Sequence, residues 1–259
     1  MHTLTVHGHR LEYIRRPSAH PRHDAPPLVF LHEGLGSIAM WRDFPQRVAD
    51  ATGCEAIVYS RHGYGRSSPL TAPRTPDYMH VEALQILPGV LDALQLRAPI
   101  LIGHSDGGSI ALIHAGGTPA PVRGVVVMAP HLYVEDVALE GIRRTVDAYR
   151  TTDLRARLAR FHADVDGVFA GWSDIWLHPD FRDWNIEAFV SAIPCPVMAI
   201  QGEDDEYATM DQIDRIARLA PDVDLVKLAD CRHSPHKDQA DAVVEAIAGF
   251  VARLLDDPH

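Results

Sequence analysis

One serine lies in a pattern that can turn its hydroxyl into a nucleophile. Ser105 occupies the centre of the segment GHSDG at 103–107, directly after an apolar run and directly before a helix-like one. A strand, a Gly-X-Ser-X-Gly turn and a helix form a nucleophile elbow, whose sharp turn exposes the serine. Side chains at Gly103 and Gly107 would collide with the neighbouring strand and helix. We therefore expect Ser105 at a helix N-terminus, where the dipole and the amide of Asp106 can stabilise an oxyanion.

Two later segments offer the base and the acid that a nucleophilic serine needs. Asp204 and Asp205 follow the apolar segment PVMAIQG, and His233 follows VDLVKLAD. If both segments are strands, these side chains lie at strand ends. The sequence has 16 histidines, so the position of His233 just past the last predicted strand is what favours it.

Short apolar runs separated by helix-sized segments predict the elements that position these residues. Each run is rich in Val, Ile and Leu on both faces, and this is typical of buried parallel strands that alternate with helices. The runs begin at Pro27, Glu55, Ala98, Val122, Cys195 and Val223. The opening LTVHGHRLEYIRR instead predicts a hairpin that turns at Gly8 and forms an antiparallel edge.

A long interval interrupts this alternation. Residues 131–193 show helical periodicity but no convincing strand, and the interval is too long for one crossover helix. We predict a helical cap over 131–193, inserted into a core formed by 1–130 and 194–259. The cap carries Trp172, Trp176 and Trp184, and we expect one or two of its aromatic side chains to face a cavity beneath it.

Nearly the whole chain resembles the α/β-hydrolase family. The segments LHEGLGS, SRHGYGRS, GHSDGG, QGEDDEY and CRHSPH occur in the order that the family uses, and so do Ser105, the acid and His233. The resemblance implies an α/β fold with a mostly parallel sheet flanked by helices and a helical cap between core strands 6 and 7. The family's Gly-x-x-Asp pattern selects Asp205 rather than Asp204. The usual glycine before the histidine is Arg232 here, which leaves His236 as an alternative base.

The family's oxyanion loop differs in this chain. The loop usually begins His-Gly, whereas here it begins His32-Glu33-Gly34. The resemblance implies that the amides of Gly34 and Asp106 form the oxyanion hole and that His32 shapes the loop. Glu33 is either solvated or paired with a basic side chain such as Arg61 or Arg66, or it reaches the substrate pocket.

The acid at position 106 is the other distinctive feature. The segments SDGG and GIRRTVDAY resemble the valacyclovir-hydrolase branch of the family. Asp106 would pair with a substrate ammonium or be held by local amides and solvent. We expect the substrate-binding residues to be Glu33, Asp106, His131, Trp172 and Trp176.

Composition excludes several other classes of function. The 24 Lys and Arg against 35 Asp and Glu give a net charge of −11, which argues against nucleic acid as a partner. The first residues alternate and carry charges, and no apolar run approaches a membrane span, so we expect a cytoplasmic protein without a membrane partner. The three cysteines have no metal-ligand spacing, which predicts neither a disulfide framework nor a metal site.

These observations predict a serine hydrolase that needs no cofactor. The expected substrate is a small to medium, partly apolar carboxylic ester, cleaved through an acyl-enzyme. Thioester, lactone or amino-acid ester hydrolysis and carbon-carbon bond cleavage in a dienoic acid remain alternatives, as does a non-catalytic binding protein of the same fold. The serine at 105 argues against dehalogenase and epoxide hydrolase chemistry, which use aspartate there. Whether the protein is a monomer or a homodimer stays open.

Overall fold

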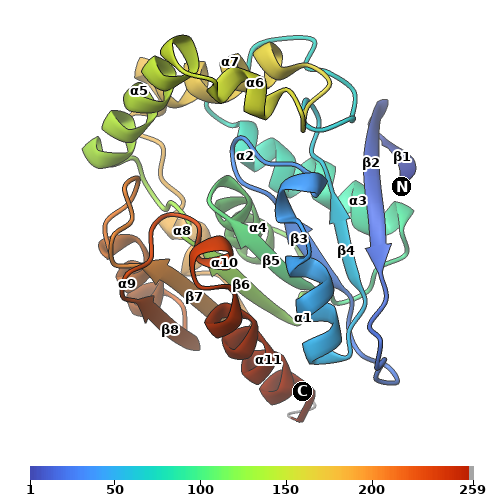
Figure 1. The fold of residues 1–259 in the computed structure, drawn as a ribbon. Coiled ribbons are helices and arrows are strands. Elements are labelled where there is room, and N and C mark those ends of the chain that lie inside the picture. Colours follow the sequence, from blue (N-terminus) through green and yellow to red (C-terminus); the bar gives the residue numbers. More distant parts are fainter. Residues whose placement is uncertain (257–259) are drawn as a thin grey trace.

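The computed structural model describes residues 1–256, which fold as one sheet with helices on both faces and a group of helices at one end (Figure 1). The strands are β1 (His2–Val6), β2 (His9–Arg16), β3 (Leu28–Leu31), β4 (Ala56–Tyr59), β5 (Ile100–His104), β6 (Gly124–Met128), β7 (Val197–Gly202) and β8 (Val223–Leu228). The helices that flank the sheet are α1 (Phe44–Thr52), α2 (Tyr78–Val81), α3 (Leu87–Ala93), α4 (Asp106–Gly117), α8 (Glu187–Val190), α9 (Asp211–Leu219), α10 (Pro235–Asp238) and α11 (Ala240–Asp256). A 3-10 turn, η1 (Ile38–Trp41), precedes α1, and a π-helical turn, η2 (Glu82–Ile86), joins α2 to α3. Across these residues no helix is both long and apolar enough to cross a bilayer.

The sheet has the strand order β1-β2-β4-β3-β5-β6-β7-β8. The β1–β2 and β2–β4 pairs are antiparallel, and every other pair is parallel. The predicted hairpin is confirmed, with Gly8 at the turn in the left-handed region (φ 82°). The predicted mostly parallel sheet is also confirmed, and its parallel strands all end at one edge.

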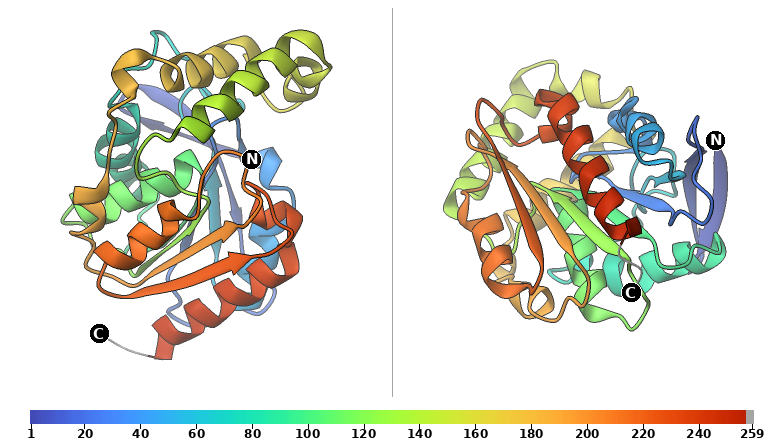
Figure 2. Two further views of the ribbon diagram at one scale, coloured as in Figure 1. Left: turned by 90° about the vertical axis from the view of Figure 1, so that its left-hand side faces the viewer. Right: turned by 90° about the horizontal axis from the view of Figure 1, so that it is seen from below.

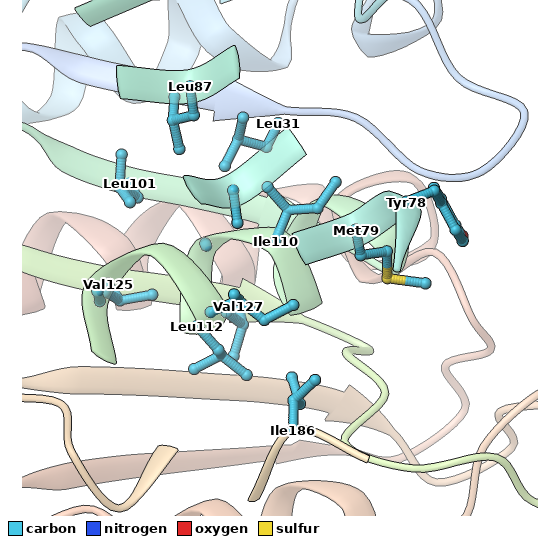
Figure 3. Close-up of a cluster of buried hydrophobic side chains, with 14 of the residues drawn as sticks. Leu31, Tyr78, Met79, Leu87, Leu101, Ile110, Leu112, Val125, Val127 and Ile186 are labelled. Carbon is cyan, nitrogen blue, oxygen red and sulfur yellow. The ribbon is translucent and has the colours of Figure 1, made fainter. Parts of the chain in front are cut away.

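Both faces of the central strands are buried, which is why their sequences are continuously apolar rather than alternating. On one face Val29, Leu101, Val125 and Val127 pack against α2, α3, α4 and α8. Figure 3 shows part of this cluster, in which Leu31, Leu101 and Ile110 lie between strand and helix. The opposite face packs against α1 and α11. The edge strand β8 is only half-buried.

The helices inserted between β6 and β7 cover the carboxyl edge of the sheet. They are α5 (Asp136–Thr151), α6 (Leu154–Leu158) and α7 (Val165–Trp176), followed by the 3-10 turn η3 (Pro179–Phe181). Figures 1 and 2 show α5, α6 and α7 together at one end of the molecule, above the sheet. The short helix α8, further along the same insertion, instead packs against α4, and a side chain at Gly116 would clash with the backbone of Phe189 there.

A buried histidine ties the inserted helices to two core loops. The ring of His162, between α6 and α7, donates from Nε2 to the carbonyl of Leu35 (2.9 Å). Its Nδ1 accepts from the amide of Gly65 (3.0 Å), and the amide of Ala163 donates to the Gly65 carbonyl (2.8 Å). Both ring nitrogens of His162 are therefore used in holding α6 and α7 on the core.

Candidate active site

The structure brings together three side chains that the sequence predicted would act as one unit. Ser105 lies between β5 and α4, Asp205 follows β7, and His233 lies between β8 and α10. Nε2 of His233 is 3.0 Å from Oγ of Ser105, and Nδ1 of His233 is 2.8 Å from Oδ1 of Asp205. The amide of Tyr207 also donates to Oδ1 of Asp205 (2.8 Å), which fixes the carboxylate. Carboxylate, imidazole and hydroxyl thus form a continuous hydrogen-bonded chain.

The turn at Ser105 has the strained geometry of a nucleophile elbow. Ser105 has φ 52° and ψ −120°, a conformation that a non-glycine residue adopts at a cost of roughly 1–3 kcal/mol. A Cβ at Gly107 would clash with the carbonyl of Leu31 in β3, and one at Gly103 with the carbonyl of Gly107 in α4. The glycines are therefore required by the close approach of strand and helix.

The surroundings of His233 favour its charged form. Burial alone would lower the pKa of His233, but the charge of Asp205 and its hydrogen bond outweigh burial and raise that pKa above its usual value. Burial would raise the pKa of Asp205, and His233 together with the Tyr207 amide instead lowers it. A carboxylate that stays ionised beside the imidazole stabilises the imidazolium that forms when His233 takes a proton.

The two alternative residues lie outside this chain of hydrogen bonds. Asp204 is exposed. His236 is 4% exposed and packs against the rings of Trp41 and His104, and neither of its ring nitrogens has a hydrogen-bond partner among residues 1–256. Burial and the neighbouring His104 hold the pKa of His236 well below its usual value.

The loop after β3 brings the backbone of Gly34 to the same cavity as Ser105 and Asp106. Within residues 1–256 the amides of Gly34 and Asp106 donate no hydrogen bond, so both are free to bind an oxyanion. His32 shapes the loop as predicted: its Nδ1 donates to the carbonyl of Glu33 (2.7 Å), and its Nε2 accepts from the amide of Arg61 (3.0 Å). Burial and the Arg61 charge hold the pKa of His32 well below its usual value, so the ring is neutral.

The basic partner of Glu33 is neither of the arginines that the sequence suggested. Oε1 of Glu33 lies 3.2 Å from Nζ of Lys237 in α10, and Oε2 lies 3.5 Å from Nδ1 of His104. Arg61 contacts only the backbone carbonyl of Glu33, because its guanidinium lies toward Asp106. Burial would raise the pKa of Glu33, but Lys237 and His104 outweigh burial and hold that pKa well below its usual value.

Asp106 is held by side chains rather than by local amides and solvent. It is 1% exposed; Oδ2 accepts from the Tyr78 hydroxyl (2.8 Å) and lies 3.7 Å from Nη2 of Arg61. Oδ1 accepts from Nε1 of Trp176 in α7 (3.2 Å). With both oxygens engaged and Arg61 beside them, the carboxylate is poorly placed to bind a substrate ammonium. Sequence reasoning missed Tyr78 and Trp176 as its partners because they lie in other elements.

A cavity of about 110 Å³ lies between the serine and the inserted helices. It is lined by all five residues predicted to bind substrate and also by groups that the sequence did not single out. These additional lining residues are Leu35, Ala138, Ile142 and Tyr207. Of the three tryptophans in the insertion, Trp172 and Trp176 line the cavity, whereas Trp184 packs on Phe181. The Trp172 ring lies so close to Gly34 that a Cβ at position 34 would collide with it.

Comparison with known proteins identifies the family. The model of the alpha/beta hydrolase family matches residues 28–246. The chain belongs to this family. The hydrolase shares 23% identity with the sn-1-specific diacylglycerol lipase ABHD11 of Danio rerio, over 88% of this chain and 79% of that protein. It shares 24% identity with the 2-hydroxy-6-oxononadienedioate/2-hydroxy-6-oxononatrienedioate hydrolase of Cupriavidus pinatubonensis, over 88% of this chain and 87% of that protein.

Solved structures resemble the hydrolase along its whole length. The enol-lactonase from Burkholderia xenovorans superimposes with a TM-score of 0.75 at 20% identity, covering 96% of this chain and 99% of that one. At this level of identity the likeness establishes the fold. Within residues 1–256 of the hydrolase, no group of three or more His, Cys, Asp or Glu side chains is arranged to hold a metal ion.

Proposed function

We propose that this hydrolase cleaves carboxylic esters through an acyl-enzyme on Ser105. The observation that carries the proposal is the hydrogen-bonded chain from Asp205 through His233 to Oγ of Ser105, with distances of 2.8 and 3.0 Å. A protein that only binds a ligand has no need of a base behind a strained serine. Membership of the alpha/beta hydrolase family supports the same reaction class.

The proposed reaction has two halves that use the same groups. His233 takes the proton of Ser105 as the serine oxygen attacks the ester carbon, and the amides of Gly34 and Asp106 bind the oxyanion. Protonated His233 then gives its proton to the departing alcohol. Water repeats the sequence on the acyl-enzyme and releases the acid. Asp205 keeps Nδ1 of His233 protonated and stabilises the imidazolium.

The cavity favours a small, uncharged substrate. An apolar cavity of about 150 Å³ holds a benzene molecule, so one of about 110 Å³ accepts a group of somewhat smaller size. Ala138, Ile142 and the two tryptophans supply an apolar wall. The carboxylates of Glu33 and Asp106 are each paired with a cation. We therefore propose uncharged esters with a short acyl or alcohol group as the preferred substrates.

A fluorophosphonate probe and an ester assay test the proposal together. We expect wild-type protein to gain the mass of one probe and to hydrolyse p-nitrophenyl butyrate. Ser105→Ala should abolish labelling and reduce turnover by about 10³-fold or more while the circular dichroism spectrum stays native. Ser173→Ala, which changes a buried serine in α7 that does not line the cavity, is the matched control and should still be labelled. Turnover near the wild-type rate in folded Ser105→Ala would overturn the mechanism.

Carbon-carbon bond cleavage is the second candidate, because relatives such as the Cupriavidus pinatubonensis protein are hydrolases of hydroxy-oxo-dienedioates. Such substrates carry carboxylates, and no lysine or arginine is among the described residues that line the cavity. We therefore expect kcat/KM for a 2-hydroxy-6-oxo-dienoate to be lower than for p-nitrophenyl butyrate. The reverse order would make carbon-carbon cleavage the better description.

A further inference from the structure

The cavity contains a second histidine that the proposed reaction does not use. His131 follows β6, is 3% exposed and lines the same cavity as Ser105 and His233. Its ring centroid lies 5.8 Å from that of His233 and 4.9 Å from that of Trp176, which it meets edge-on. Within residues 1–256 neither ring nitrogen of His131 has a hydrogen-bond partner, and Nδ1 is buried.

The backbone of His131 is fixed, so the ring is presented in one place. The hydroxyl of Ser109, fully buried in α4, donates to the carbonyl of His131 (2.7 Å) and accepts from its amide (3.0 Å). A buried polar group that lacks a partner costs about 1–3 kcal/mol, and a phenylalanine would pack against Trp176 without that cost. A histidine held here is explained if a ligand supplies the missing hydrogen bond.

The charge of His131 limits which ligand group it can bind. Burial and the neighbouring His233 lower the pKa of His131 to about 4, so the ring is neutral near pH 7. A neutral imidazole offers one donor and one acceptor and no net charge. Among the other polar side chains in the lining, Glu33 is engaged with Lys237, Asp106 with Tyr78, and the Tyr207 hydroxyl with Thr145 (2.6 Å). The indole N–H of Trp172 can only donate a hydrogen bond, whereas His131 can donate and accept. A hydroxyl group, which both donates and accepts, is the complementary ligand for either tautomer of His131.

We propose that His131 binds a hydroxyl group of the substrate, which makes hydroxy-substituted esters the preferred class. This inference rests on the proposed ester hydrolysis at Ser105. His131 neighbours His233, whose Nε2 is 3.0 Å from the serine oxygen. Because His131 and Ser105 line the same cavity, a hydroxyl group bound to His131 lies near the scissile carbonyl of the ester. It belongs to the acyl group or to the alcohol group of the ester.

Two pairs of esters of equal size distinguish these sources. In the acyl pair, p-nitrophenyl lactate is compared with p-nitrophenyl isobutyrate, which replaces the hydroxyl by a methyl group. In the alcohol pair, 2-hydroxyethyl butyrate is compared with propyl butyrate. For the wild type we expect kcat/KM to favour the hydroxy ester of one pair by about threefold to tenfold, the worth of one net hydrogen bond.

Variants at position 131 test whether the histidine causes this preference. His131→Phe should lower the ratio of the two kcat/KM values by about threefold to tenfold, because it removes the hydrogen bond but leaves the intrinsic reactivities of the two esters unchanged. His131→Gln, which restores a donor and an acceptor, should recover part of this loss. His80→Phe is the matched control, because His80 also meets a tryptophan edge-on and has an unpartnered Nδ1 but does not line the cavity. It should keep the wild-type ratio.

The outcomes separate this inference from the proposed function. Ester turnover without a preference for either hydroxy ester overturns the inference and leaves the proposed function standing. A ratio of kcat/KM values that stays at the wild-type value in His131→Phe, or in His131→Leu should the phenylalanine variant fail to fold, also overturns it. Absence of both ester turnover and fluorophosphonate labelling overturns the proposed function, and the inference with it.

Discussion

The hydrogen bond from Trp176 to Asp106 links the inserted helices to the residue that follows Ser105, and its contribution to stability can be isolated. Trp176→Phe removes the donor from a carboxylate oxygen that is 1% exposed. A hydrogen bond to a charged group contributes about 1.5–3 kcal/mol. Tyr78 and Arg61 still contact Oδ2 of Asp106 in this variant. The loss in free energy of unfolding should therefore stay below the roughly 3–5 kcal/mol seen when a buried charge loses its ionic partner.

The substitution also removes ring atoms, and a second tryptophan corrects for that loss. Trp184 is 7% exposed, packs on the same aromatic cluster, and its Nε1 has no hydrogen-bond partner among residues 1–256. Trp184→Phe therefore removes the same atoms without removing a hydrogen bond. The free energy of unfolding should fall by at least about 1.5 kcal/mol more in Trp176→Phe than in Trp184→Phe, because the first variant loses a hydrogen bond and the second removes a buried N–H that has no partner.

Urea unfolding followed by far-ultraviolet circular dichroism measures both losses, since tryptophan fluorescence would change with the substitutions themselves. The slope of free energy against urea should be the same in both variants and the wild type. If the two variants lose equal stability to within about 0.5 kcal/mol, which is at most about a tenth of the usual free energy of unfolding, the bond to Asp106 contributes nothing and the reasoning is refuted.

Three further outcomes are expected. Asp205→Asn should lower kcat for p-nitrophenyl butyrate by roughly 10³- to 10⁴-fold and Asp204→Asn by little, since only the Asp205 carboxylate accepts a hydrogen bond from His233. Equal losses of kcat in the two variants would show that the acid is wrongly assigned. Because the pKa of His233 is raised and the base must be neutral, kcat/KM should decline as pH falls through a value above 6.5, and a profile flat from pH 5 to 8 would contradict this. Buried histidines such as His32 and His236 have lowered pKa values, so the unfolded chain binds more protons than the folded protein below about pH 6.5. The urea concentration at the midpoint of unfolding should therefore be lower at pH 5 than at pH 7. The raised pKa of His233 acts in the opposite direction, but it is one group against several.

The main features of the fold could be predicted because residue patterns within short segments determine them. Each buried strand is a continuous apolar run, and the hairpin at Gly8 is marked by its turn residue. Ser105, Asp205 and His233 follow three of these runs within a few residues. Because parallel strands end at one edge of the sheet, the order of the runs is enough to expect that these side chains meet.

The partners of the acidic residues could not be predicted because they depend on packing between distant elements. Lys237, which pairs with Glu33, is 204 residues away in the sequence, and α10 brings it to the loop after β3. Trp176 reaches Asp106 from the inserted helices, 70 residues away. Both contacts depend on where a helix rests on the sheet and on side-chain direction, and the spacing of apolar residues specifies neither.

The contact between Gly34 and Trp172 has a consequence for attempts to change specificity by exchanging caps. Trp172 occupies the space that a side chain at position 34 would need, so the two positions cannot be varied independently. A transplanted cap with a smaller residue at 172 would leave a void over the Gly34 amide, and an unmodified cap on a core with a larger residue at 34 would not close. Chimeras of this hydrolase should therefore exchange the loop after β3 together with α7, as a single module drawn from one parent.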